Sequence, residues 1–167
     1  MITTEVVEWT DPRVDALHTA LFAETGALYK PWLDELTPDA LAAARASLVV
    51  DPGEIVITLL VLDDGRPVGT GAVRPSLPHP DHEWDVKRVY VEPSHRGQGL
   101  SKQIMLDLAS RAPAHGVTSI VLETGGLQTA AHGLYESLGY QRIEAYPPYG
   151  FFPGERFYGL RLQPTAR

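Results

Sequence analysis

The segment Val89–Lys102 contains the residue types that bind an anion, arranged as a strand, a tight loop and the start of a helix. Gly97 and Gly99 remove side chains where the backbone turns, so consecutive N–H groups can point from a helix N-terminus into a concavity. Arg96 and Lys102 can add positive charge there. The segment predicts a binding site for phosphate-type oxygens, with a plain strand-to-helix turn as the alternative interpretation.

Two well-known phosphate-binding loops do not match this segment. A P-loop needs Gly-Lys followed by Ser or Thr, whereas the order here is Gly99-Leu100-Ser101-Lys102. A dinucleotide-binding loop needs a third glycine where Lys102 stands. Glu123 follows about 20 residues later at the end of another expected strand, where that fold places its ribose ligand. Nicotinamide-dinucleotide binding therefore stays an alternative.

Two carboxylates precede the loop on the strand expected over Trp84–Val91. Period-two alternation predicts that Asp85 shares a face with Val89, and that Glu83, with its longer reach, shares the face of Asp85. Either carboxylate could accept a proton directly or through water, as a general base does. The alternative is an acidic face that is simply solvated.

Metal and thiolate chemistry are not predicted. The histidines and carboxylates at His79, Asp81, His82, Glu83 and Asp85 lie in a segment interrupted by prolines, without a recognised ligand spacing, so a substrate-facing loop is preferred. The sequence has no cysteine, which excludes a thiolate nucleophile and every Cys-containing zinc site.

Hydrophobic periodicity and turn residues predict a mixed sheet flanked by helices, which is an α/β fold. The Asp64-Gly65 pair indicates a hairpin, and a strand–helix–strand crossover follows it. The expected strands are Ile2–Trp9, Ile55–Leu62, Val68–Val73, Trp84–Val91, Ser119–Glu123, Gln141–Ala145 and Phe157–Leu162. The expected helices begin near Pro12, Pro38, Gly99 and Thr129, and the first of them runs toward Phe22.

Length and charge restrict the class of protein. The 167 residues predict one domain over 1–167, and the formal charge of −7 makes nucleic acid a poor partner. An apolar run long enough to span a membrane is not found, and no signal peptide is recognised after Met1, so we expect a cytoplasmic protein.

Three ordered motifs resemble the GNAT superfamily of N-acetyltransferases. Arg96–Ser101 is similar to the family's Q/R-x-x-G-x-G/A loop, although Ser101 stands where the family prefers Gly or Ala. Leu122–Gly125 and Leu134–Tyr140 resemble the family's later strand and helix. The resemblance covers about Asp85–Tyr140 and implies a GNAT-like acyl-CoA N-acyltransferase fold, with a mostly antiparallel sheet and one splayed parallel pair.

The resemblance implies that the ligand is acetyl-CoA. Its pantetheine arm would pair with the backbone of the strand, and its pyrophosphate would accept hydrogen bonds from the loop. Gln128 stands where many relatives carry an asparagine near the cofactor. The cofactor-binding residues implied are Val89, Tyr90, Val91, Arg96, Gly97, Gln98, Gly99, Leu100, Ser101, Lys102 and Gln128.

The resemblance also implies transfer of the acetyl group to a primary amine by direct attack in a ternary complex. Tyr135 matches the family's general acid, with core packing as its alternative role, and Asp85 matches a glutamate base of histone-modifying members. The acceptor is a small molecule or a peptide amine, and the acidic balance favours a cationic one. The alternative is a non-catalytic acyl-CoA-binding module; monomer and homodimer both stay open.

Aromatic residues supply the expected acceptor lining, with core packing again as the alternative. They are Trp32, Trp84, Tyr146, Tyr149, Phe151 and Phe152.

Overall fold

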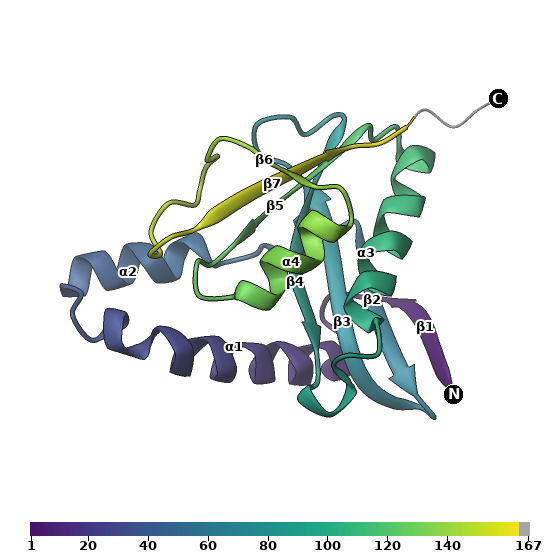
Figure 1. Cartoon of the computed structure of the whole chain (residues 1–167), viewed down its shortest axis with the longest axis horizontal. Helices are drawn as coiled ribbons and strands as arrows, with labels where there is room; N and C mark the ends of the chain where they lie inside the picture. The colour runs from purple at the N-terminus through teal and green to yellow at the C-terminus, as the bar shows by residue number, and fades with distance from the viewer. Residues whose placement is uncertain (164–167) are drawn as a thin grey trace.

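A single seven-stranded mixed sheet, with helices packed on it, organises the computed structural model, which describes residues 1–163 (Figure 1). Of the domain expected over 1–167, residues 164–167 lie outside the described part. The strands are β1 (Ile2–Val7), β2 (Ile57–Asp63), β3 (Arg66–Pro75), β4 (Glu83–Val91), β5 (Ser119–Thr124), β6 (Gln141–Arg142) and β7 (Arg156–Arg161). The helices are α1 (Pro12–Leu33), α2 (Pro38–Ser47), α3 (Leu100–Arg111) and α4 (Thr129–Ser137), with short 3-10 turns at Pro52–Glu54, Pro93–His95 and Ala112–His115.

The strand order is β1-β2-β3-β4-β5-β7-β6, and every described pairing is antiparallel except β4 with β5. This is the predicted fold class: a mostly antiparallel sheet with one parallel pair and flanking helices. Figure 1 shows α1 and α2 joined at one side of the molecule and α3 at the other.

Strand β2 is covered on both faces of the sheet, which explains its continuous apolar run over Leu59–Leu62. Leu59 and Val61 belong to the larger core, which also contains residues of α3. Leu60 and Leu62 alternate with them and pack in a second core with Val14 and other residues of α1. Period-two alternation thus supplies two apolar faces, and each covering helix buries its stripe against one of them.

Local signals in the sequence set several boundaries as expected. Asp64 and Gly65 both have positive φ, 48° and 82°, as the tight turn between β2 and β3 requires. Asp11 and Thr37 accept hydrogen bonds from backbone N–H groups at the starts of α1 and α2. The predicted hairpin and both predicted helix starts are confirmed.

Helix α1 is longer than expected, because it continues from Phe22 to Leu33 across Gly26 and Pro31. These two residues are poor helix formers, so local propensity does not extend the helix. Tertiary packing does: Tyr29 is 4% exposed, and its hydroxyl accepts a hydrogen bond from the Leu127 N–H at 3.1 Å. The extension carries α1 across the opening between β4 and β5.

Strands β4 and β5 pair over only three residues each, Glu83–Asp85 with Ser119–Val121, and then separate. Strand β4 also contains a bulge: its register with β3 shifts between Lys87 and Tyr90, and Arg88 has a φ of 51°. Gly71 of β3 faces this bulge, and a Cβ there would lie 2.6 Å from Ile104 Cγ2. The predicted splayed pair is therefore present, together with a bulge that alternation did not reveal.

Candidate active site

The glycine loop has the geometry of an anion cradle. Gly97 and Gly99 have φ values of 77° and 79°, in the left-handed region that glycine favours, and a Cβ at either position would meet nothing within 4 Å. Gly99 is the N-cap of α3, and no side chain caps the helix there among the described residues. The first N–H groups of α3 are therefore available to an anionic ligand.

The two cationic residues of the loop differ in what holds them. Arg96 donates from Nε to the Val91 carbonyl at 2.9 Å and from a terminal nitrogen to Glu24 of α1 at 2.7 Å. Its guanidinium also lies over the Tyr90 ring, 5.6 Å from the centroid. Arg96 thus ties the loop to α1, whereas Lys102 is exposed and available for phosphate contacts.

The side chains of the other predicted cofactor residues divide between core and surface. Val91 and Leu100 lie in the larger core, and Val89 packs against it. Tyr90 is 6% exposed and packs in the second core with residues of α1. Of the remaining loop residues, Gln98 is exposed and Ser101 is half-buried. Any contact of the buried members with a cofactor must come from their backbone.

The bulge corrects the predicted alternation along β4. Asp85 contacts the Tyr146 and Tyr149 hydroxyls, whereas Val89 lies near the α3 residue Ile104 on the other face. The prediction that Asp85 and Val89 share a face is wrong, because the extra residue at Arg88 inverts the alternation.

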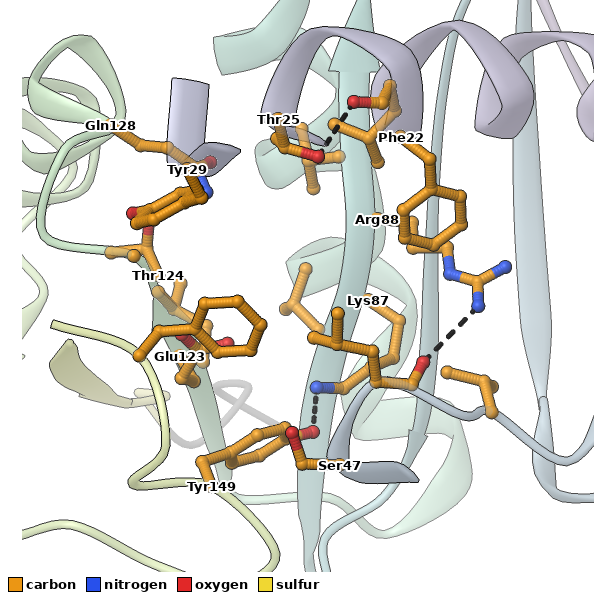
Figure 2. A pocket seen from close by; sticks show the side chains of 18 of the residues that line it. Phe22, Thr25, Tyr29, Ser47, Lys87, Arg88, Glu123, Thr124, Gln128 and Tyr149 are labelled. Carbon is orange, nitrogen blue, oxygen red and sulfur yellow. Dashed lines mark hydrogen bonds between the residues drawn. The ribbon is translucent and has the colours of Figure 1, made fainter. Parts of the chain in front are cut away.

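A cavity of about 240 Å³ lies where β4 and β5 separate. Helix α1 contributes one wall, and the end of α2 with the following residues contributes another (Figure 2). Glu123 of β5, Tyr135 of α4 and Gln128 line it together with Lys87 and Arg88 of β4. The cavity is thus bordered by both splayed strands.

Glu123 is the carboxylate in this cavity. It is half-buried, and its pKa is raised from 4.5 to about 7, chiefly by burial; Lys87 opposes this rise, and nearby Glu155 and Asp85 contribute to it. Within residues 1–163 no hydrogen bond or ion pair holds the carboxylate. A carboxyl group that titrates near neutral pH is well matched to general-base catalysis. From the sequence alone Glu123 is predicted only as a ribose ligand; its place at the end of the splaying strand is the signal for another role.

Asp85 has no such freedom. It is 1% exposed, and its two oxygens accept hydrogen bonds from Tyr146 at 3.0 Å and Tyr149 at 2.9 Å. Arg74 Nε lies 3.4 Å away and Lys87 Nζ lies 3.0 Å away. Four partners therefore hold Asp85 as an internal counterion beneath the cavity, which does not support the base role predicted for it.

Glu83 is held outside the cavity at the paired end of the two strands. Its two oxygens accept hydrogen bonds from Ser76 at 2.8 Å and Ser119 at 2.9 Å. These bonds join β3, β4 and β5 across the short parallel pairing. The geometry gives Glu83 a structural role and does not support the predicted base role.

Tyr135 combines core packing with access to the cavity. Its ring lies 6.0 Å from Tyr140 and 5.8 Å from Tyr158, and the residue is 7% exposed. Burial, with Glu123 nearby, raises the pKa of its phenol well above the ordinary value, so the hydroxyl stays protonated. The ring packs in the larger core, and the residue also lines the cavity, where its general-acid role stays a prediction.

Of the aromatics expected around the acceptor, two line the cavity, Tyr149 and Phe152. Trp84 lies in the larger core and Tyr146 in a small cluster with Phe157, which is the alternative that the sequence left open for them. Trp32 packs on Phe152, 5.0 Å between ring centroids, and Phe151 is 44% exposed.

The turn between β5 and α4 contacts α1 through Tyr29. Gln128 lies at this turn beside Tyr29 (Figure 2), and a Cβ on Gly125 would lie 1.9 Å from the Tyr29 hydroxyl. Gly125 is therefore required for the close approach of α1. Gln128 lines the cavity, and its cofactor role stays a prediction.

No helix among the described residues is long and apolar enough to cross a membrane. No group of three or more histidine, aspartate or glutamate side chains in 1–163 is arranged to hold a metal ion.

Comparison with known proteins defines the class. Residues 14–140 match the family model described as the acetyltransferase (GNAT) family, which is most of the chain. The chain therefore belongs to the GNAT acetyltransferase family, as its three motifs predicted.

Particular relatives agree with this assignment. The chain is 30% identical to a protein of Klebsiella pneumoniae assigned to the acyl-CoA N-acyltransferases, with a TM-score of 0.76 over 98% of this chain and 99% of that one. The Escherichia coli ribosomal-protein-S18-alanine N-acetyltransferase shares the fold, with a TM-score of 0.62, 21% identity, and coverage of 97% and 94%.

Curated relatives match over a shorter region. The chain is 34% identical to the N-acetylaspartate synthetase of Xenopus tropicalis over 80 residues, which is 48% of this chain and 29% of that protein. It is 38% identical to N-acetyltransferase 8 of Mus musculus over 80 residues, 47% of this chain and 35% of that protein. The matched region is about a third of each relative's length.

Proposed function

We propose that this acyltransferase transfers the acetyl group of acetyl-CoA to a primary amine by direct attack in a ternary complex. One observation carries the proposal: the cavity meets the split between β4 and β5, and Glu123 and Tyr135 both line it. The open glycine cradle follows β4 directly, so this strand connects the proposed CoA site with the cavity for the acceptor.

The chain has features that fit acetyl-CoA. The backbone of β4 beyond Asp85 has no pairing with β5, so an extended arm can lie there as an added strand. Gly97 and Gly99 offer open space and N–H groups for the phosphates. Acetyl-CoA would supply an acetyl group already activated as a thioester.

Glu123 and Tyr135 perform the two proton transfers in this proposal. Glu123, as carboxylate, accepts a proton from the acceptor nitrogen, which forms a bond to the thioester carbonyl carbon. The carbon–sulfur bond breaks, and Tyr135 donates its phenolic proton to the departing sulfur. Exchange with solvent returns both side chains to their starting states.

The test is release of free CoA thiol from acetyl-CoA by the whole chain across a panel of primary amines. We expect amine-dependent release, and initial rates that give intersecting lines when both substrates are varied, as a ternary complex requires. The melting temperature should rise with CoA and not with NAD, because selective binding adds RT ln(1 + [L]/Kd) to the free energy of unfolding.

Two outcomes would contradict the proposal. CoA binding without release with any amine would identify a non-catalytic acyl-CoA-binding module. Parallel initial-rate lines would indicate a covalent acetyl-enzyme, which the proposed direct attack excludes.

A further inference from the structure

The cavity carries more positive than negative charge, although the whole chain is acidic. Its positively charged lining residues are Arg45, Lys87 and Arg88, and its negatively charged lining residue is Glu123. Figure 2 shows Arg88 and Glu123 on opposite sides of the cavity, with Lys87 between them. The net charge of the whole chain therefore does not describe the charge that an acceptor contacts in the cavity.

Lys87 is already neutralised within the protein. Its ammonium lies 3.0 Å from Asp85 Oδ2 and donates a hydrogen bond to the Tyr149 hydroxyl. Its side chain is 8% exposed, and Tyr149 also lies beneath its ammonium. The charge that is left for a ligand must come from the two arginines.

Arg88 has no such counterion. Its guanidinium lies between two rings, 4.8 Å from the Trp9 centroid and 4.7 Å from the Phe22 centroid. Its polar contacts within residues 1–163 are both long, 3.4 Å to His18 Nδ1 and 3.4 Å to the Leu48 carbonyl. A guanidinium has five N–H donors, so several remain for a ligand.

The surroundings of Arg88 favour an anionic ligand. Arg88 is half-buried, and among the described residues it forms no ion pair. Burial lowers the pKa of the guanidinium, opposed by a longer-range effect of Asp15. Its φ of 51° is a strained conformation for arginine, and such strain often marks functional sites.

Arg45 adds a second cation at the same side. It lies in the last turn of α2, is exposed, and forms no ion pair with any residue in the described part of the chain. A cation in the last turn also stabilises its helix, which gives Arg45 a structural alternative. Arg88 likewise has an alternative, as a clamp between Trp9 and Phe22.

We propose that the acceptor is an amino acid, whose carboxylate binds Arg88 with help from Arg45 while its amine lies near Glu123. A planar guanidinium fork matches a carboxylate with two parallel hydrogen bonds, and Arg88 is half-buried, which strengthens such a pair. The apolar lining of α1, including Leu21 and Phe22, accommodates the rest of the molecule. This inference rests on the proposed acetyl transfer and names its substrate class.

The test compares matched acceptors in the CoA-release assay. L-Phenylalanine, L-leucine, β-alanine and 4-aminobutyrate are each paired with the amine that lacks the carboxyl group and with the amide. For at least one pair we expect kcat/KM to be about 10- to 100-fold higher for the acid, the range for a hydrogen-bonded charge. Equal or lower values for all the acids would overturn the inference.

Variants separate carboxylate binding from a structural clamp. Arg88→Asn removes the guanidinium while tolerating positive φ, and should reduce kcat/KM for the preferred acid about 10- to 100-fold but leave its decarboxylated amine within about twofold. Arg88→Lys should retain part of the preference. Arg161→Gln, which removes one exposed charge on β7, should change neither substrate.

The outcomes distinguish this inference from the proposed function. An equal loss for acid and amine in Arg88→Asn, with CoA affinity retained, identifies a structural clamp and overturns the inference. Release with amines and amides but not with acids overturns the inference and leaves acetyl transfer intact. No release with any member of the panel overturns both.

Discussion

The two proposed binding regions of this protein are built differently. The glycine cradle is one continuous segment that presents backbone N–H groups into open space, at Gly97 and Gly99. The acceptor cavity is formed by side chains from α1, α2, β4, β5 and α4, which are far apart in the sequence. A backbone site depends on glycines and local turns, whereas a side-chain site depends on how the elements pack.

This difference has a functional consequence. Residues in the cradle should affect binding of CoA and leave the choice of acceptor unchanged. Residues in the cavity should affect turnover and acceptor choice and leave CoA affinity unchanged. The following predictions test that separation, beginning with the largest expected effect.

Glu123→Gln should reduce kcat by about 10²–10⁴-fold, the usual contribution of general acid–base catalysis, with CoA affinity unchanged. Because the pKa of Glu123 is raised to about 7, wild-type kcat/KM should rise with pH through that value, and the variant should lose this rise. Rates across a pH series provide the measurement. A variant with a wild-type profile would remove Glu123 as the base.

Tyr135→Phe should lower kcat by about 10²-fold, because it keeps the buried ring and removes the only O–H donor of that side chain. Fold and CoA affinity should persist. Tyr135→Ala should in addition lose about 3–5 kcal/mol of stability through lost packing. Wild-type kcat in a folded Tyr135→Phe protein, under conditions where acetyl transfer limits the rate, would contradict the donor role.

Gly99→Val should weaken CoA binding about tenfold or more, because it places a β-branched side chain in the cradle and strains the positive φ. Gly116→Val is the matched control, since Gly116 also has a positive φ, 74°, with open space around its Cβ, but ends the 3-10 turn after α3. Both variants should lose stability, and calorimetry should show weaker CoA binding only for Gly99→Val. Equal CoA affinities for Gly99→Val and Gly116→Val would show that the glycine cradle does not bind CoA.

Glu123 should also affect stability with pH. Its pKa is higher in the folded protein, about 7, than the ordinary 4.5, so folding favours the neutral form. That stabilisation is complete below about pH 4.5 and is lost as pH rises through about 7. Glu123→Gln should therefore gain melting temperature relative to wild type between about pH 5 and pH 8. A constant difference would show that the carboxyl is not desolvated.

The smallest effect concerns the Arg96–Glu24 ion pair, an exposed pair of the kind that contributes about 0–1 kcal/mol. If Arg96 acts by tying the loop to α1, Glu24→Gln and Arg96→Ala should both weaken CoA binding, each by less than about tenfold. The loss in Arg96→Ala should shrink as salt concentration rises. Tighter CoA binding by Glu24→Gln would instead show that Arg96 is a direct phosphate ligand.

The sequence predicted the parts of the structure that short segments determine. Caps at Asp11 and Thr37, the Asp64-Gly65 turn and the glycine loop all depend on a few neighbouring residues. The order of strands and helices followed from these signals and from hydrophobic periodicity. The cradle belongs to this class, which is why it could be located before any packing was known.

The parts that were missed depend on contacts between distant segments. Helix α1 continues past Gly26 because Tyr29 reaches the β5–α4 turn. The environment of Glu123 is set by burial between β5 and its neighbours, and no single-strand pattern reports that. The sequence therefore favours Asp85 or Glu83 as the base, and Asp85 is a carboxylate whose four partners come from β3, β4 and the segment before β7.

The bulge at Arg88 makes β4 behave as two strands of opposite parity joined end to end. Asp85 and Lys87 precede it and face the acceptor side, whereas Val89 and Val91 follow it and face the α3 core. A one-residue deletion at the bulge would act on the fold as a frameshift acts on a gene. Every residue beyond it would exchange faces, bringing Tyr90 into the α3 core and the valines under α1. The number of residues along β4 is therefore fixed by the two cores that its side chains must fill.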